Sequence, residues 1–285
     1  MRIRRFLVKP IIAPHMDGRM GSNVNGPSLI KVPDWVARPL GRYYLYFGHH
    51  NGAYIRLAYA DRLEGPWRTH EPGVLDLVDS FCIGHVASPD VHIDVERREL
   101  WMYYHGPDAA GGQMTRLALS TDGIQFMARP DILGTFYFRV WRWDGWWYGL
   151  VMPGKIMRSR DGLAPFELGP TLFSEDMRHS AVRPVGNVLH VFYTNVGDCP
   201  ERILQCTIEL TPNWMEWRES ESVTVLTPEM DWEGANLPLV PSKRGAANEP
   251  VNQLRDPAIY EEEGRTYLLY SVAGERGIAI AEIIG

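Results

Sequence analysis

The 285-residue sequence has no uninterrupted apolar run that approaches the roughly 20 residues a membrane helix requires. It also has no excess of positive charge, because 35 Asp and Glu residues outnumber 29 Lys and Arg residues and give a formal charge of −6. We therefore expect neither a membrane nor a nucleic acid as a partner. No glycine-rich loop runs into a helix, so phosphoryl transfer finds no support.

Cysteine is scarce as well. Cys82, Cys199 and Cys206 are odd in number and lack the spacing of metal ligands, which argues against a disulfide framework and against a zinc site. The apolar stretch near the start of the chain is broken by Lys9 and Pro10 before it reaches the length of a signal-peptide core. We expect a protein that stays in the cytoplasm.

Aromatic residues, glycine and proline are plentiful. The chain has 10 Trp, 13 Tyr, 27 Gly and 21 Pro, a mixture typical of many short strands separated by tight turns. One pattern recurs five times: a short apolar strand, an aromatic-rich strand that ends in a polar loop, and a strand of smaller residues. The five aromatic-rich segments are Tyr43–Gly48, Leu100–Gly106, Trp146–Leu150, Leu189–Tyr193 and Thr266–Ser271.

Alternation of apolar and polar positions predicts antiparallel strands, and five such units predict one all-β domain over residues 1–285, a five-bladed β-propeller. The fifth unit lacks an outer strand, and residues 2–8 have the alternation of an edge strand. We expect this N-terminal strand to complete the last blade and close the ring. A β-sandwich also uses short strands but does not explain five units in register.

In such a ring, the starts of the innermost strands and the loops after the aromatic strands face one mouth. A carboxylate or arginine on a buried strand is costly unless it is paired or used, so the charged residues there are candidates. The strand starts contribute Asn25, Asp90, His179, Arg183, Arg255 and Asp256, the loops contribute His49, His50, His105 and Glu201, and Asp17 lies in the approach to the first blade.

Each candidate also has a structural interpretation. Asp90 follows a proline and would serve to cap a turn, although Asp256 before Pro257 makes two carboxylates at what we interpret as equivalent strand starts. Arg255 would serve as the counter-ion of Asp256, and Glu201 would pair with Arg202. We interpret three further histidines as structural, namely His85, His92 and His190.

Carboxylates, histidines and aromatic rings at one mouth suit a carbohydrate. Aromatic faces stack on sugar rings, polar side chains pair with hydroxyls, and two carboxylates supply an acid and a base for glycoside hydrolysis. No cofactor is expected, although the ring of carboxylates and histidines is also compatible with a cation in the channel.

The sequence resembles the five-bladed propeller glycoside hydrolases of family 43, the arabinanase and xylosidase group. The residues that carry the resemblance are Ser88–Val91, Arg255–Ile259 and Tyr267–Ser271. The resemblance implies an inverting enzyme with a first-blade Asp base, a second-blade Asp that tunes the acid, and a third-blade Glu acid. Asp90 matches the second-blade Asp.

The other two positions differ from the family pattern, because Asn25–Ser28 contains no Asp and Gly134–Arg139 contains no Glu. We expect a glycoside hydrolase, inverting and acting on a small plant- or algal-type oligosaccharide, with Asp90 and Asp256 as its main carboxylates. Asp17 would replace the missing base, and Glu201 or a histidine the missing acid. The alternatives are a sugar-binding propeller without turnover, and a phosphorylase that holds phosphate with Arg183, Arg255 and His179.

Overall fold

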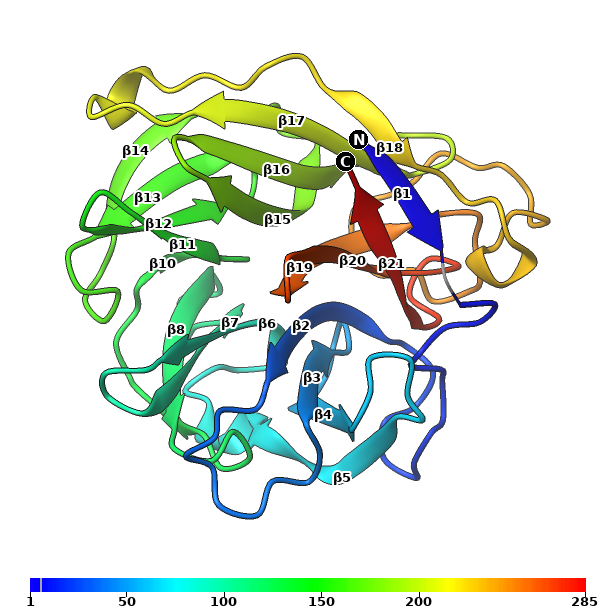
Figure 1. The fold of residues 1–285 in the computed structure, drawn as a ribbon, viewed down its shortest axis with the longest axis horizontal. Helices are drawn as coiled ribbons and strands as arrows, with labels where there is room; N and C mark the ends of the chain where they lie inside the picture. The colour runs from blue at the N-terminus through cyan, green and yellow to red at the C-terminus, as the bar shows by residue number, and fades with distance from the viewer. Residues whose placement is uncertain (6) are drawn as a thin grey trace.

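The strands of the computed structural model form five antiparallel sheets arranged as blades around a central axis (Figure 1). The structure describes residues 1–5 and 7–285. The first blade consists of β2 (Asn25–Lys31), β3 (Tyr43–Gly48), β4 (Tyr54–Ala60) and β5 (Arg68–Asp76). The second consists of β6 (Ala87–Asp94), β7 (Glu99–Pro107), β8 (Gln113–Ser120), β9 (Met127–Ala128) and β10 (Gly134–Thr135). The third consists of β11 (Arg139–Trp143), β12 (Trp146–Val151), β13 (Lys155–Ser159) and β14 (Glu167–Thr171).

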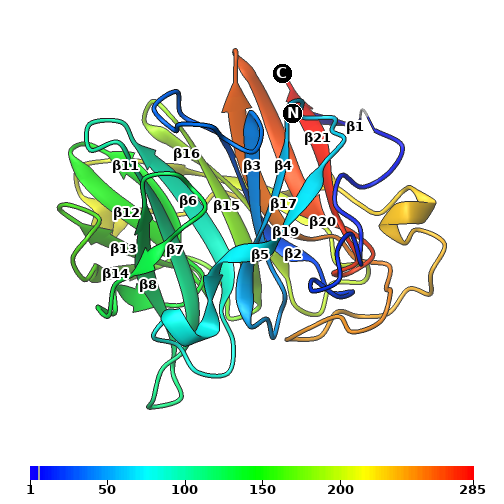
Figure 2. The same cartoon turned by 90° about the horizontal axis from the view of Figure 1, so that it is seen from below.

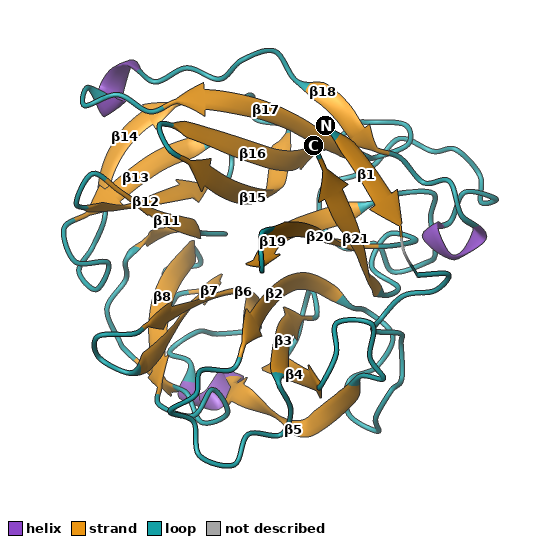
Figure 3. Ribbon diagram, viewed as in Figure 1, coloured by secondary structure: helices purple, strands orange, loops and turns teal. Residues whose placement is uncertain are grey.

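The fourth blade consists of β15 (Met177–Val185), β16 (Val188–Asn195), β17 (Ile203–Glu209) and β18 (Val223–Leu226). The fifth consists of β19 (Arg255–Glu262), β20 (Arg265–Ser271) and β21 (Ile278–Ile284), together with β1 (Arg2–Arg5). The helical turns η1 (Leu77–Asp79), η2 (Trp214–Glu216) and η3 (Asp231–Glu233) lie at the periphery (Figure 3). In the part of the chain that the structure describes, no helix is long and apolar enough to span a membrane. The predicted all-β five-bladed ring is confirmed.

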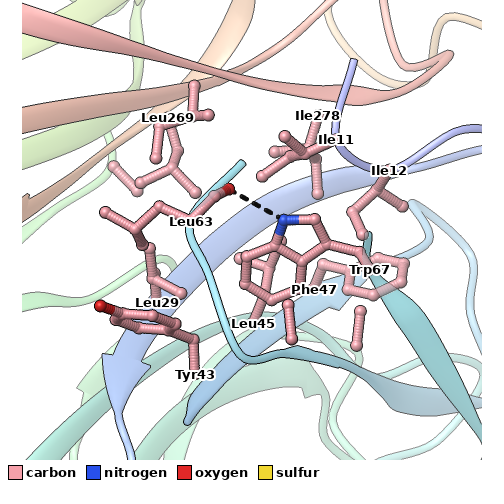
Figure 4. Packing of buried hydrophobic residues seen from close by; sticks show 14 of the residues in the cluster. Ile11, Ile12, Leu29, Tyr43, Leu45, Phe47, Leu63, Trp67, Leu269 and Ile278 are labelled. Atoms are coloured by element: carbon pink, nitrogen blue, oxygen red, sulfur yellow. Dashed lines mark hydrogen bonds between the residues drawn. The ribbon is translucent and has the colours of Figure 1, made fainter. Parts of the chain in front are cut away.

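Burial on both faces explains the aromatic strands. Successive side chains of a strand point to opposite faces of its sheet, and here each face packs against a different neighbouring blade. In β3, Tyr43 and Leu45 belong to the core shared with the fifth blade, whereas Tyr44 and Tyr46 belong to the core shared with the second. Figure 4 shows the first of these cores, in which the Trp67 indole donates a hydrogen bond of 3.0 Å to the Leu63 carbonyl. Five such cores hold the ring together.

The N-terminal strand closes the ring. Strand β1 pairs antiparallel with β21, with Arg2 opposite Ile284 and Arg5 opposite Ala281, and both chain ends lie beside the fifth blade (Figure 1). The predicted closure is therefore confirmed for residues 2–5. Of the rest of the predicted segment, Phe6 lies outside the described residues.

A long connection joins the fourth blade to the fifth. Residues 227–254 carry a single helical turn, η3, and extend beyond the strands at one edge of the molecule (Figure 2). The connection returns to the ring through backbone hydrogen bonds from Gly197 to Ser242 and from Leu254 to Glu201. It thereby reaches the mouth at which the innermost strands begin.

Candidate functional site

A residue with left-handed backbone marks the start of every innermost strand. Gly26, Ser88, Tyr137, His179 and Asp256 have φ of 59°, 51°, 63°, 51° and 49°, respectively. In four of the five blades the strand register shifts beside this residue, as in a β-bulge. A bulge redirects a side chain, and left-handed backbone is unfavourable for a residue with a Cβ, so such residues persist where the surrounding structure fixes them, commonly at functional sites.

Four of these five residues, all except Gly26, line one cavity of about 360 Å³ at the mouth of the ring. Its volume falls at the lower end of the range of about 300–1,000 Å³ typical of small-molecule sites. The remaining lining residues are Asn25, His50, Asn51, His85, Ala87, His105, Gln113, Phe136, Met152, Arg178, Arg244 and Gly245.

Among the described residues, Asp256 is the one carboxylate that lines this cavity. Its Oδ1 accepts a hydrogen bond of 3.0 Å from the Tyr137 hydroxyl and lies 3.8 Å from His179 Nε2, whereas its Oδ2 is buried without a partner. Burial, followed by the charge of Glu275, raises the pKa of Asp256 to about 6, although Arg255 and the Tyr137 hydrogen bond act in the opposite direction. Asp256 can therefore hold a proton in mildly acidic solution.

Three histidines of the cavity, His85, His105 and His179, are neutral at pH 7. Burial, reinforced by neighbouring positive groups, lowers the pKa of His105 to about 3 and lowers the pKa of His179 well below its usual 6.5. Burial also lowers the pKa of His85. The Nδ1 atoms of His105 and His179 are buried without a hydrogen-bond partner in the protein. These imidazoles can thus accept a proton or a hydrogen bond, but they hold no proton to give as imidazolium.

Four buried charges balance one another at the cavity: Arg178 lines it, and Glu201, Arg255 and Glu275 lie behind its wall. Glu201 accepts a hydrogen bond of 2.9 Å from Arg178 Nε and lies 3.1 Å from Arg255 Nε. Arg255 in turn donates a hydrogen bond of 2.9 Å to Glu275, which lies 3.5 Å from His50 Nδ1. All four side chains are almost fully buried, so their two positive and two negative charges stabilise each other in a low-dielectric environment.

This network accounts for two predicted site residues. Both oxygens of Glu201 are engaged, one by Arg178 and the Thr194 hydroxyl and the other by Arg178 and Arg255. Neither Glu201 nor Arg255 lines the cavity. The predicted pairing of Glu201 with Arg202 is wrong, because Arg202 pairs with Asp198 at 3.3 Å.

The expectation that Asp90 and Asp256 stand at equivalent strand starts is wrong. Both Ser88 and Asp256 carry the bulge and precede a proline, so Ser88 is the counterpart of Asp256, and Asp90 is the counterpart of Ala258. Asp90 lies further along the channel, in a separate cavity of about 180 Å³, where it accepts hydrogen bonds from His92 (2.9 Å) and from the Val140 amide (2.8 Å).

The other predicted residues divide between the cavity and positions outside it. Asn25, His50, His105 and His179 line the cavity. Asp17 does not, and its carboxylate accepts hydrogen bonds from two backbone amides of its own loop. The His49 ring accepts a hydrogen bond from the Asn51 amide, and Arg183 pairs with Glu261 at 2.8 Å.

Sequence reasoning missed several lining residues. Tyr137 lines the cavity but was not among the candidate residues, and His85, which we interpreted as structural, lines it as well. Arg244 reaches the cavity from the long connection, where no strand pattern points to it. The available signal was positional: in four of the five blades, the residue near the start of the innermost strand lines the mouth cavity. Within residues 1–5 and 7–285, no group of three or more His, Cys, Asp or Glu side chains is arranged to hold a metal ion.

One relative shows the family of the chain. The uncharacterized protein R118 of Acanthamoeba polyphaga mimivirus is 38% identical over 297 residues, which cover 92% of this chain and 83% of R118. The chain belongs to the R118 family. No family model matches the sequence.

Solved structures extend the comparison to the fold of the R118 family. A family 43 β-xylosidase/α-arabinofuranosidase from a compost microbial metagenome has a TM-score of 0.68 at 13% identity, covering 99% of this chain and 95% of that chain. The GH43_1 enzyme from Xanthomonas citri, complexed with xylose, has a TM-score of 0.63 at 13% identity, covering 96% and 90%. The fold is that of the family 43 glycoside hydrolases, as the sequence resemblance implied.

Proposed function

We propose that this chain is a glycoside hydrolase that acts on a small oligosaccharide in the cavity at the mouth of the ring. The observation that carries the proposal is Asp256, a buried carboxyl group in the cavity wall with a pKa of about 6 and one oxygen without a partner. A carboxyl group that holds its proton near the working pH is suited to general acid catalysis.

The composition of the cavity wall supports a sugar as the ligand. Buried polar atoms nearly always have hydrogen-bond partners, yet atoms of four lining residues have none in the protein: Gln113 Oε1, His105 Nδ1, His179 Nδ1 and Asp256 Oδ2. Hydroxyl groups of a sugar would satisfy them. Phe136 and Met152 add apolar surface against which a sugar ring can pack.

The protonation states assign the catalytic roles. The neutral His105 and His179 have no imidazolium proton to donate, so Asp256 is the proton donor to the leaving oxygen. His105 lies on the second blade, which is not adjacent to the fifth, and its ring centroid is 6.1 Å from that of Tyr137, the partner of Asp256. We assign His105 the role of the base that takes a proton from the attacking water.

This assignment is an inverting mechanism. Water attacks the anomeric carbon while His105 takes its proton, and the glycosidic bond breaks while Asp256 protonates the departing oxygen. A retaining mechanism would require a second carboxylate as the nucleophile, and Asp256 is the one carboxylate of the cavity among the described residues. The likeness to a solved complex with xylose supports xylo-oligosaccharides of plant cell walls as the first substrates to test.

The presence of a single carboxylate in the cavity also favours an alternative function, sugar binding without turnover. The hydrolases of the family that the sequence resembles use two carboxylates as acid and base, so a cavity with one would also suit a sugar-binding propeller without turnover. A phosphorylase would use inorganic phosphate in place of water, held by Arg178 and Arg244 of the cavity wall.

Product analysis separates these functions. Wild-type protein is incubated with xylo-, arabino- and galacto-oligosaccharides, with and without inorganic phosphate, and the products are resolved by chromatography and by ¹H NMR of the anomeric protons. We expect free sugar of inverted configuration. Asp256→Asn should lower turnover by about 10²- to 10⁴-fold with binding retained, whereas the surface variant Asp131→Asn should not. Sugar phosphate, or binding without products in the wild type, would contradict the proposal.

A further inference from the structure

We propose that Tyr137 and Arg139 are positioning residues for Asp256: Arg139 orients the Tyr137 hydroxyl toward Oδ1 of Asp256, which leaves Oδ2 as the oxygen that carries and transfers the proton. This inference rests on the proposed function of Asp256. The two positioning residues belong to the third blade and Asp256 to the fifth, and strands β11 and β19 lie on opposite sides of the axis (Figure 1).

The direction of the hydrogen bonds follows from the donor and acceptor groups. A guanidinium has only donors, so the contact of 3.3 Å between Arg139 Nη2 and the Tyr137 oxygen uses the hydroxyl as the acceptor. The hydroxyl has one proton, which it then gives to Oδ1 of Asp256 at 3.0 Å. Tyr137 is 3% exposed, and no other described group donates a hydrogen bond to the Asp256 carboxyl group.

Arg139 itself is held firmly. Its Nε donates to the Ser180 carbonyl at 3.0 Å, its Nη1 donates to the Pro89 and Phe138 carbonyls at 3.2 Å, and its guanidinium carbon lies 4.5 Å from the centre of the Tyr137 ring. These carbonyls belong to the second, third and fourth blades. Arg139 is 3% exposed, lines the cavity of Asp90 and contacts Tyr137, which lines the mouth cavity. Three blades therefore fix the orientation of one hydroxyl.

The hydrogen bond has a measurable electrostatic consequence. The titratable and charged groups around Asp256 come from several elements. They are Tyr137, just before β11, and Arg139 from β11; Arg178 and His179 from β15; Arg255 from β19; and Glu201, Glu275 and His50 from the loops. A donor to Oδ1 stabilises the ionised carboxylate and lowers its pKa. Loss of the Tyr137 hydroxyl should therefore raise the pKa of Asp256.

The test follows the protonation of Asp256 directly. The protein is labelled with ¹³C at the aspartate carboxyl carbon, and the Asp256 resonance is identified by its loss in Asp256→Asn. We expect Tyr137→Phe to raise the titration midpoint by about one pH unit, the value of a hydrogen bond to a charged group. The control is Tyr103→Phe, which removes another buried hydroxyl that donates to the Gly162 carbonyl at 3.0 Å. An unchanged midpoint in Tyr137→Phe, or an equal shift in Tyr103→Phe, would overturn the proposal.

Arg139→Lys tests the second positioning residue, because it keeps the charge and removes the planar fork. It should raise the midpoint of Asp256 in the wild-type background and change it little in the Tyr137→Phe background. Equal shifts in both backgrounds would refute the role of Arg139. Since no substrate is present, the titration is independent of turnover: failure to cleave any glycan would refute the proposed function, and an unmoved midpoint would refute this inference alone.

Discussion

Glu201 and Arg255 form an ion pair of 3.1 Å that joins the fourth and fifth blades behind the cavity wall. Glu201 lies in the loop after β16, and Arg255 is the first residue of β19. The contact therefore joins two blades that the long connection 227–254 separates along the chain. Glu201 is fully buried, and it neutralises Arg178 as well. The pair therefore shapes the mouth without lining it.

Glu201→Gln should destabilise the fold strongly. The variant keeps the shape of the side chain but leaves the charges of Arg178 and Arg255 short of one counter-ion in a buried environment, which typically costs about 3–5 kcal/mol. Urea denaturation should show this loss in the free energy of unfolding. Glu261→Gln removes the exposed partner of Arg183. This control should change the free energy of unfolding by no more than about 1 kcal/mol. Equal effects of the two variants would contradict the assigned role of Glu201.

The dependence of kcat/KM on pH should be bell-shaped, with its maximum at acidic pH. Asp256 must be protonated to act as the acid, so kcat/KM should fall as the pH rises through about 6. His105 must be neutral to act as the base, so kcat/KM should also fall as the pH decreases through about 3. A plateau that extends unchanged to pH 9 in the free-enzyme parameter kcat/KM would show that Asp256 is not the acid.

Asp256→Asn should stabilise the protein at high pH. The pKa of Asp256 is about 6 in the folded protein and 3.8 as the reference value, so the folded state binds the proton more tightly. Its ionisation therefore lowers the stability of the wild type as the pH rises from about 4 to 6, by up to about 3 kcal/mol. The stability difference between Asp256→Asn and the wild type should grow from pH 4 to pH 8. The control is Asp131→Asn, which removes one charge of the exposed pair with Arg129. Its stability difference from the wild type should stay constant over the same pH range.

Removal of residues 1–5 should open the ring. The deletion removes the β1 to β21 pairing and the ion pair of 2.7 Å between Arg5 and the fully buried Glu233. An unpaired buried carboxylate costs several kcal/mol, so Tm should fall by about 10 °C in a chain of this size. Removal of residues 1–2 keeps Arg5 and should have a small effect. A Tm unchanged by the longer deletion would show that β1 does not close the ring.

The fold was predictable because each blade buries both faces of its inner strands. That burial makes neighbouring positions such as Tyr44 and Leu45 apolar together, and the pattern repeats five times. The residues of the outer strands β5, β14 and β18 were not predicted, since these strands are partly exposed and carry mixed polar residues. Packing between blades produces an apolar pattern that can be recognised in the sequence, whereas an exposed edge strand produces little pattern.

The site was predictable in part. Asp256 stood out as a carboxylate at the start of a buried strand, and that placement puts it in the cavity. Asp90 was misplaced because it lies two positions after Ser88, which carries the bulge of its strand and is the counterpart of Asp256. Tyr137 resembled core aromatics, and the partners of Glu201 include Arg255, which is 54 positions away in the chain and meets it only in the folded ring. Long-range pairing of charges therefore escaped the sequence analysis.

The central claim is that Asp256 protonates the glycosidic oxygen of a sugar bound at the mouth of the ring. A crystal structure of Asp256→Asn with the oligosaccharide that the wild type cleaves tests it most directly, because the variant retains the shape of the cavity and preserves the substrate. The account predicts a glycosidic oxygen within about 2.6–3.2 Å of the Oδ2 position of residue 256, with the anomeric carbon facing His105. A sugar bound in the cavity of Asp90, or one whose glycosidic oxygen lies out of reach of residue 256, would contradict it.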